Sequence, residues 1–152
     1  MAVLEIVQYP NELLHQVSTE VTTFDKNLRK LVKDMFETMY QNDGIGLAGV
    51  QVGVLKRVIV IHVDTDEENF KSEIINPKIL SFSKEESVMK EGCLSVIGKA
   101  YEIKRPNEVV VEFQKCDGKT YQVKANGLLA KCFQHEIDHL NGITIADRGA
   151  KS

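Results

Sequence analysis

Long hydrophobic runs are missing from this sequence. No window approaches the roughly 18 to 20 apolar residues that a membrane-spanning helix needs. The N-terminal stretch "MAVLEIVQYPNELL" has no cationic region ahead of a long apolar one, as a secretory signal would. We therefore expect a protein of the cytoplasm that is neither secreted nor bound to a membrane.

An excess of basic residues and a disulfide pattern are also missing. The net charge is −3 and the cations are scattered, so no basic stripe can follow nucleic-acid phosphates. We expect no direct nucleic-acid binding. The 3 cysteines, Cys93, Cys116 and Cys132, are odd in number and form no disulfide framework. This favours a reducing compartment and leaves at least one thiol for another role.

The composition is that of an ordinary globular domain. Apolar residues make up 43% of the 152 residues and charged residues 27%, which is enough to bury a core without disulfides. No repeat, low-complexity tract or linker divides the chain, and only its end, "ADRGAKS", looks frayed. We predict a single domain over residues 1–152.

Hydrophobic periodicity predicts two helices. Over 25–42, apolar residues recur at intervals of three and four, and Thr23 or Asp25 can cap the start. A second helix is predicted to begin after Asn126 and to stop at Gly142. Because the stretch between the helices lacks this period, it is expected to be mostly sheet.

Short β-branched runs predict the strands of that sheet. The first covers 57–63, and the Asp117-Gly118 pair predicts a tight hairpin turn between the last two. The other candidates are "EIINPKILSF", "SVMKEG", "AYEIKR", "EVVVEFQ" and "TYQVKA". The expected fold class is α+β, with a mainly antiparallel sheet packed around a central helix.

The second helix carries the segment "CFQHEIDHLNG". His135 and His139 are four residues apart, so they share one helix face and can direct ring nitrogens at one metal ion. Glu136 lies one step around the helix, within reach of a metal-bound water. A five-residue match can also arise by chance. Burying three ionisable residues on a short, partly apolar helix would, however, be costly without a partner such as a metal.

A catalytic metal site usually takes three protein ligands. Cys93, in "EGCLS", is the best candidate for the third, because the preceding glycine lets the backbone approach another element. Cys116 is expected to be an exposed, inert thiol in a turn. Cys132 could ligate, but a small apolar core residue is the favoured role for a helical cysteine.

The segment "GIGLAGVQVG" packs four glycines into ten residues. It lacks the Lys-Ser/Thr pair of a P-loop and does not open a helix after a strand, so a nucleotide site is not expected. The glycines can instead let an extended backbone approach a ligand, with the Gln51 amide beside it. The alternative is a simple tight loop with Gln51 in solvent.

Three motifs in this order, "GIGLAGVQ", "EGCLS" and "QHEIDHLNG", resemble the signature motifs of the peptide deformylases, and the resemblance covers almost the whole chain. It implies a peptide deformylase-like fold around a metal-binding helix. It also implies hydrolytic removal of the formyl group from the N-terminal formyl-methionine of newly made polypeptides, with release of formate.

The resemblance further implies a role for each matching residue. Cys93, His135 and His139 would bind the metal, and Glu136 would be the general acid and base. The Gln51 side chain and the Leu94 N–H would stabilise the oxyanion. The substrate would be held by Ile45, Gly46, Leu47, Gly92 and Leu128. The backbone of the first three would pair with it as an added strand, and Leu128 would line the methionine pocket unless it is a core residue.

One divalent metal per chain is expected. A ligand set of one thiolate and two imidazoles suits zinc, iron(II), cobalt or nickel, and the resemblance favours Fe2+ in the cell, with Zn2+, Ni2+ or Co2+ in purified protein. The metal would lower the pKa of its bound water from 15.7 toward about 7, and the resulting hydroxide would attack the formyl carbon. Glu91 and Arg105 could form an ion pair that steadies the Cys93 loop.

A few positions depart from the family's usual pattern. Gly49 replaces an alanine, Ile97 replaces a proline beside the expected cleft, and Lys131 brings a charge beside the methionine pocket. The chain ends about ten residues after the histidine motif, whereas many bacterial members continue into a helix used for ribosome docking. We therefore expect a short, monomeric form that acts on formyl-methionyl nascent peptides, and ribosome association stays open.

Two other functions compete with this one. A peptidase of the zincin type would need a third ligand downstream of the histidine motif, where only Asp147 remains. A structural metal site or an inactive binding module would not require Glu136 or Gln51, yet both are present.

Overall fold

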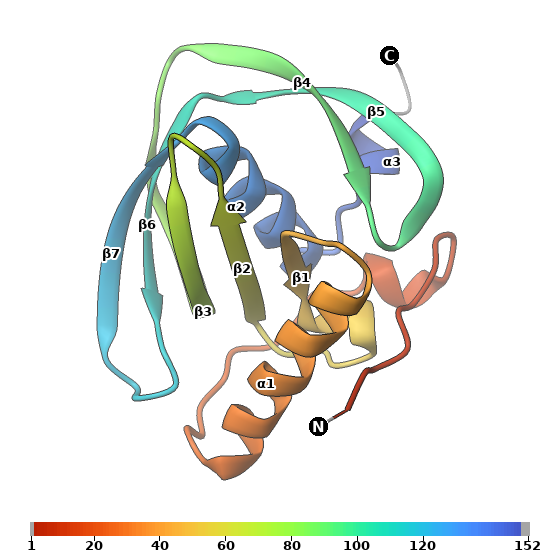
Figure 1. The fold of residues 1–152 in the computed structure, drawn as a ribbon, viewed down its shortest axis with the longest axis vertical. Helices are drawn as coiled ribbons and strands as arrows, with labels where there is room; N and C mark the ends of the chain where they lie inside the picture. Colours follow the sequence, from red (N-terminus) through yellow and green to blue (C-terminus); the bar gives the residue numbers. More distant parts are fainter. Residues whose placement is uncertain (1, 150–152) are drawn as a thin grey trace.

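In the computed structural model, which describes residues 2–149, two long helices lie on opposite faces of a five-stranded antiparallel sheet. A two-stranded antiparallel ribbon arches over one end (Figure 1). The strands of the sheet, in spatial order, are β1 (Gly46–Ala48), β2 (Val58–Asp64), β3 (Asn69–Phe82), β6 (Glu108–Gln114) and β7 (Thr120–Asn126). The ribbon is formed by β4 (Glu86–Cys93) and β5 (Val96–Pro106). The helices are α1 (Lys26–Gln41), α2 (Gly127–Leu140) and α3 (Ile145–Gly149), with 3-10 turns η1 (Glu12–His15) and η2 (Gly49–Val52). The α+β class is confirmed.

Strand β2 is the centre of the core. Its side chains alternate between two apolar clusters, with Ile59, Ile61 and Val63 on the α2 side and Val58 and Val60 on the α1 side. Because a helix covers each face of the sheet here, the strand is apolar at almost every position and shows no polar alternation.

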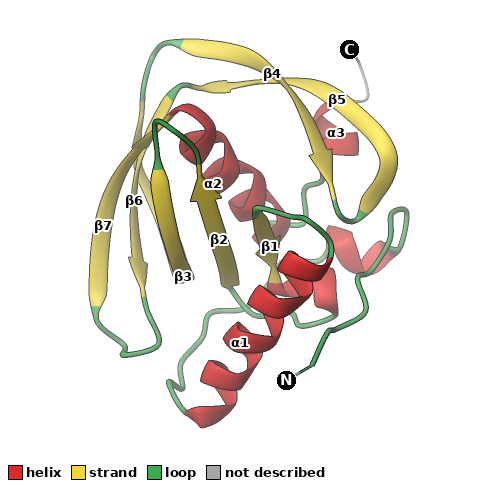
Figure 2. Cartoon of the chain, in the orientation of Figure 1, coloured by secondary structure: helices red, strands yellow, loops and turns green. Residues whose placement is uncertain are grey.

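The two predicted long helices are confirmed, and their ends are set by local contacts. The Asp25 carboxylate accepts a hydrogen bond from the Leu28 N–H at 3.0 Å and caps α1. Helix α2 lies within the curve of the sheet (Figure 2). After α2, Gly142 has a φ of 76°, and a β-carbon there would lie 2.6 Å from the carbonyl oxygen of His15. Only glycine fits this turn.

The ribbon has a small apolar cluster of its own. Val96 and Ile103 of β5 pack against Ile145 of α3, with Cys93 and Tyr101 beside them. The prediction of a frayed end was therefore wrong up to Gly149, since α3 is anchored by Ile145. Residues 150–152 of that predicted tail lie outside the described part of the chain.

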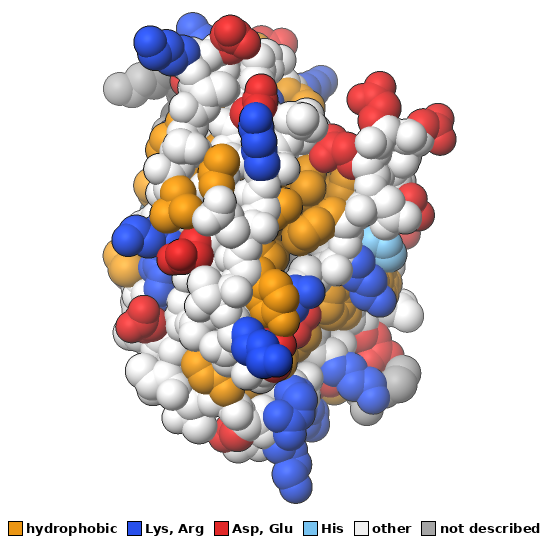
Figure 3. Space-filling view, turned by 90° about the vertical axis from the view of Figure 1, so that its left-hand side faces the viewer, with side chains coloured by type: hydrophobic (Ala, Val, Ile, Leu, Met, Phe, Trp, Pro, Cys, Tyr) orange, Lys and Arg blue, Asp and Glu red, His pale blue; other side chains and the backbone are white. Residues whose placement is uncertain are grey.

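The surface is mixed in character. On the face drawn in Figure 3, hydrophobic side chains gather in a central band, with acidic side chains at its upper right and basic ones mainly below. Among residues 2–149, no helix is both long and apolar enough to cross a membrane. Cys116 was predicted to be exposed, but it is half-buried. Burial, with Glu73 beside it, raises the pKa of this thiol to about 11.

Candidate functional site

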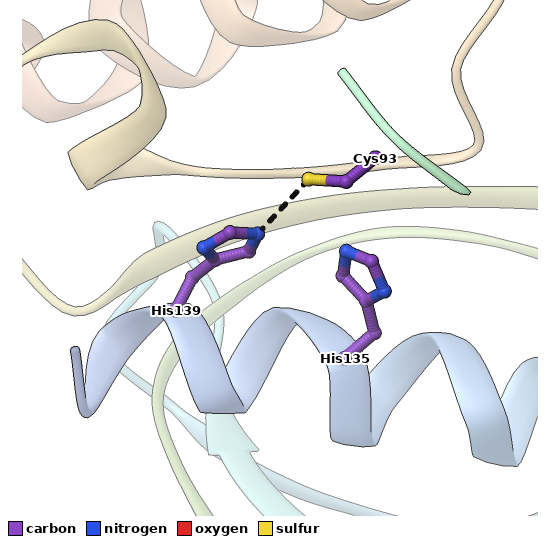
Figure 4. A group of neighbouring side chains, drawn as sticks. All are labelled: Cys93, His135 and His139. Carbon is purple, nitrogen blue, oxygen red and sulfur yellow. Dashed lines mark hydrogen bonds between the residues drawn. The ribbon is translucent and has the colours of Figure 1, made fainter. Parts of the chain in front are cut away.

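Cys93, His135 and His139 come together in the structure. Their ligand atoms all lie within 4.8 Å of one another, and the Cys93 Sγ is 3.3 Å from the Nε2 of His139. Both rings project from α2 toward the end of β4, where Cys93 lies (Figure 4). The i, i+4 spacing on α2 places the two ring centroids 5.2 Å apart.

This group fits a divalent cation. A cysteine and two imidazoles are a typical donor set for zinc and related transition metals. Burial opposes a charge on His135, but Glu136, Cys93 and Glu91 outweigh it and raise its pKa to about 10. Burial, with His135 and Arg105 adding to it, lowers the pKa of His139. Of the two rings, His139 is therefore held in the neutral form, which is the form in which an imidazole binds a metal.

A series of linked ion pairs contacts His135 on the side of its ring that faces away from Cys93. The Nδ1 of His135 lies 3.0 Å from Glu91 Oε1, which leaves the Nε2 to face the cluster. Arg105 donates two hydrogen bonds to the Glu91 carboxylate, at 2.7 and 3.0 Å, and a third to Asp138 at 2.8 Å. Arg148 of α3 donates to the same Asp138 carboxylate at 2.8 Å. Such contacts fix ring orientation and the choice of ligating nitrogen.

Glu136 lies in the same site with unused hydrogen-bonding capacity. Its side chain is buried, and among the described residues Oε1 has no hydrogen-bond partner. Its Oε2 is 3.9 Å from the Nε2 of His135. Burial raises the pKa of Glu136 to about 7, against the lowering effect of the His135 charge. A carboxyl group with this pKa can both accept and release a proton near neutral pH.

Gln51 is buried beside Cys93, so the alternative of a solvent-exposed side chain is wrong. Its Oε1 accepts a hydrogen bond from the Ala48 N–H at 2.9 Å. Its Nε2 donates to Ser95 Oγ at 3.1 Å and approaches Cys93 Sγ at 3.5 Å. The amide is thus held with its N–H groups toward the cysteine.

A cavity of about 360 Å³ opens onto these groups. Glu136, Gln51, Cys93, Leu94 and His135 line it, together with the expected substrate-binding residues Ile45, Gly46, Gly92 and Leu128. Leu47 is not among the lining residues, because its side chain is fully buried in the α1 cluster. The role expected of Leu47 concerns only its backbone.

Gly46 explains why the glycine-rich segment can form this wall. A β-carbon at this position would lie 2.7 Å from Glu136 Oε2 and 2.9 Å from Cys132 Sγ. The backbone of β1 therefore passes directly against the motif on α2. Cys132 itself is buried in the apolar core, as predicted for a helical cysteine, and also borders the cavity.

Several residues that hold the site side chains in place were not identified from the sequence. Ser95, Asp138 and Arg148 were not singled out, although Asp138 stands inside the histidine motif, where a carboxylate on a buried helix needs a partner. Asp147, the downstream ligand that a zincin-type site would require, is instead paired with His15 and Thr144. It does not belong to the metal-ligand group.

Comparisons with known proteins agree with this geometry. The family model described as polypeptide deformylase matches residues 3–152. A peptide deformylase from Rhizobium meliloti (strain 1021) is 47% identical over 148 residues, which is 97% of this chain and 85% of that protein.

Solved structures give the same result. The crystal structure of peptide deformylase from Ehrlichia chaffeensis in complex with actinonin has a TM-score of 0.94 and 47% identity, covering 97% of this chain and 89% of that one. The structure of peptide deformylase from Thermotoga maritima has a TM-score of 0.91 and 39% identity, covering 97% and 98%. The chain therefore belongs to the polypeptide deformylase family of enzymes.

Proposed function

We propose that this enzyme removes the formyl group from the N-terminal formyl-methionine of newly synthesised polypeptides and releases formate. The observation that carries the proposal is that Cys93 and His135 of the Cys93–His135–His139 group line one cavity with Glu136 and the fixed amide of Gln51. Among residues 2–149, the Glu136 Oε1 has no hydrogen-bond partner. Family membership supports the reaction, and this geometry supports the individual roles.

Cys93, His135 and His139 would hold one divalent metal. When bound, such a metal supplies Lewis acidity and lowers the pKa of water toward about 7, so that a hydrolytic nucleophile is available at neutral pH. Iron(II) is the ion that we propose in the cell, with zinc, nickel or cobalt able to take the site in purified protein.

Glu136 would move the proton. It takes the proton from the attacking water and delivers it to the leaving amine of methionine. This role is supported by the buried carboxyl oxygen, which has no partner among residues 2–149, and by burial, which raises the pKa of Glu136 to about 7.

Gln51 and Leu94 would stabilise the charge that develops on the formyl oxygen. The Gln51 amide is already oriented by Ala48 and Ser95, so it pays no reorganisation cost during the reaction. Leu94 follows Cys93 directly and lines the cavity, so its N–H lies next to the proposed ligand. Loss of one such donor typically costs about 10² to 10³ in rate.

The substrate would bind as an added strand along β1. Within residues 2–149, β1 is an edge strand that pairs with β2, so a peptide could add along its other edge. The backbone of Ile45, Gly46 and Leu47 would form the hydrogen bonds, with Gly92 on the opposite wall. Leu128 would contact the methionine side chain, supported by its place in the cavity lining.

We further propose that residues 1–152 act as one monomeric catalytic domain. Because formylated nascent peptides are made by ribosomes, the reaction would take place in the cytoplasm.

The test is formate release from a formyl-methionyl tripeptide. We expect turnover by the wild-type chain loaded with metal, a loss of at least about 10²-fold in Glu136→Gln, and unchanged metal content in that variant. Glu67→Gln, a substitution at an exposed glutamate, is the matched control and should keep full activity. The proposal fails if the wild type is inactive with iron, nickel, cobalt and zinc alike.

A further inference from the structure

Lys131 occupies an unusual place for a lysine. It lies on α2 one turn before His135, and only 4% of its surface is exposed. Its Nζ donates two hydrogen bonds of 2.8 Å to backbone carbonyls, one to Ser87 on β4 and one to Arg105 on β5. The ammonium group thus fastens the helix to both strands of the ribbon.

The same lysine lines the cavity that holds the proposed active site. The cavity lining also contains the apolar or weakly polar side chains of Met89, Leu128 and Cys132, and the carboxylate of Glu91. Lys90 also borders the cavity, but it is solvent-exposed. Of the two lysines that line the cavity, Lys131 is therefore the buried one.

The hydrogen-bonding capacity of this ammonium is incomplete. A lysine ammonium carries three N–H donors, and two of them are used by the carbonyls of Ser87 and Arg105. Within residues 2–149 no third acceptor is found for it. A desolvated N–H of a charged group gains more from a new acceptor than an exposed one does.

We propose that Lys131 determines which first side chain the enzyme accepts, and that it extends the substrate class to long side chains that carry an oxygen acceptor near their end. This inference rests on the proposed function. Methionine sulfoxide is the natural probe, because its sulfinyl oxygen would accept the third N–H. The thioether of methionine is only a weak acceptor, and norleucine has none.

The test compares three formylated tripeptides that differ only in the first residue: norleucine, methionine and methionine sulfoxide. For each enzyme variant, the measured quantity is the kcat/KM for the sulfoxide peptide divided by that for the norleucine peptide. Both values come from one preparation, so a loss of folded or metal-loaded protein cancels in the ratio.

Lys131→Met keeps the length of the side chain and removes the charge. We expect the ratio to fall about tenfold relative to the wild type, which is the effect of losing one hydrogen bond from a charged donor. Lys131→Arg should keep most of the ratio. Lys90→Met removes the exposed cation at the same cavity and should leave the ratio unchanged.

A binding measurement gives a readout without turnover. The unformylated tripeptides should compete for the site, and calorimetry should show that the preference for the sulfoxide peptide is lost in Lys131→Met. Equal ratios in the wild type and Lys131→Met, with formate still released from the methionine peptide, would overturn this inference alone. Absence of formate from all three peptides would overturn the proposed function.

Discussion

Helix α2 is held by different forces on its two sides. Toward the five-stranded sheet it buries a large apolar cluster, which includes Leu129, Phe133 and Leu140. Toward the β4–β5 ribbon it presents Lys131, His135 and Asp138, each bound to partners on that ribbon. Apolar packing has no preferred direction, so it secures the helix in place. The ion pairs have defined geometry, so they fix the orientation of particular side chains.

This difference indicates that the apolar side of α2 mainly sets the stability of the fold, whereas the ion-paired side mainly sets the geometry of the site. Buried ion pairs are weak evidence for stability, because desolvating the charges offsets much of their attraction. The Glu91–Arg105–Asp138 chain is therefore better explained by what it positions, which is the ring of His135 and the end of β4 with Cys93. Substitutions on the two sides of α2 should accordingly change different quantities.

The largest expected effect is a loss of stability from a substitution on the side of α2 that faces the five-stranded sheet. Phe133 is fully buried and packs against Phe70 and Phe113. Phe133→Ala should lower the free energy of unfolding by about 3–5 kcal/mol, measured by urea denaturation. The metal affinity of the folded fraction should stay at the wild-type value. A fall in metal affinity as large as the fall in stability would show that the sheet side of α2 also sets the geometry of the site.

The next largest effect is a loss of metal affinity from a substitution in the β4–β5 ribbon. Glu91→Gln keeps the size of the side chain but weakens the contact to His135 Nδ1. Metal affinity should fall about 10- to 100-fold, measured by competition with a chelator. Glu102→Gln, an exposed change on β5, is the control and should leave affinity unchanged. Wild-type affinity in Glu91→Gln would show that the ion-pair chain does not position the ligand.

A smaller effect on stability and metal affinity is expected at Arg148, the outermost member of the same series of ion pairs. The Arg148 side chain is 41% exposed, and it reaches Glu91 only through Asp138 and Arg105. Arg148→Met should cost about 1 kcal/mol of stability or less and change metal affinity less than Glu91→Gln does. A larger fall in affinity than in Glu91→Gln would mean that α3 acts on the site by another route.

The smallest effect concerns acid stability at the base of α3. Burial raises the pKa of Asp147, but the Thr144 N–H and His15 outweigh it, so the pKa lies below the ordinary value of 3.8. A carboxylate with a lowered folded pKa stabilises the protein above its unfolded pKa and loses that contribution as pH falls through the folded pKa. The Tm difference between wild type and Asp147→Asn should therefore shrink below about pH 4. A constant difference across that range would contradict the pairing.

Local pattern predicted the regular elements well. The periodicity of α1 and the β-branched runs of β2 and β6 gave their positions, because each is long enough to show its own period. Strand β1 and helix α3 are too short for that. Helix α3 depends on Ile145 finding Val96 and Ile103, which are distant in the sequence.

The site was predictable only in its motif-bearing parts. Cys93 and Glu136 were singled out by spacing and chemistry, and Gln51 by the family resemblance; the structure brings all three to one cavity. Ser95 and Arg148 were missed because their contribution is a contact across the fold, to Gln51 and Asp138. Lys131 could be noted as a charge near a pocket, but its bridge between β4 and β5 exists only in three dimensions.

Metal titration of the wild type and two cysteine variants would show whether the end of β4 and α2 build one metal site from Cys93, His135 and His139. Calorimetry with a divalent metal should give one ion per chain for the wild type and for Cys116→Ala, and an affinity at least about 100-fold weaker for Cys93→Ala. Wild-type affinity in Cys93→Ala, or a loss of binding in Cys116→Ala, would rule out Cys93 as the third ligand of this site.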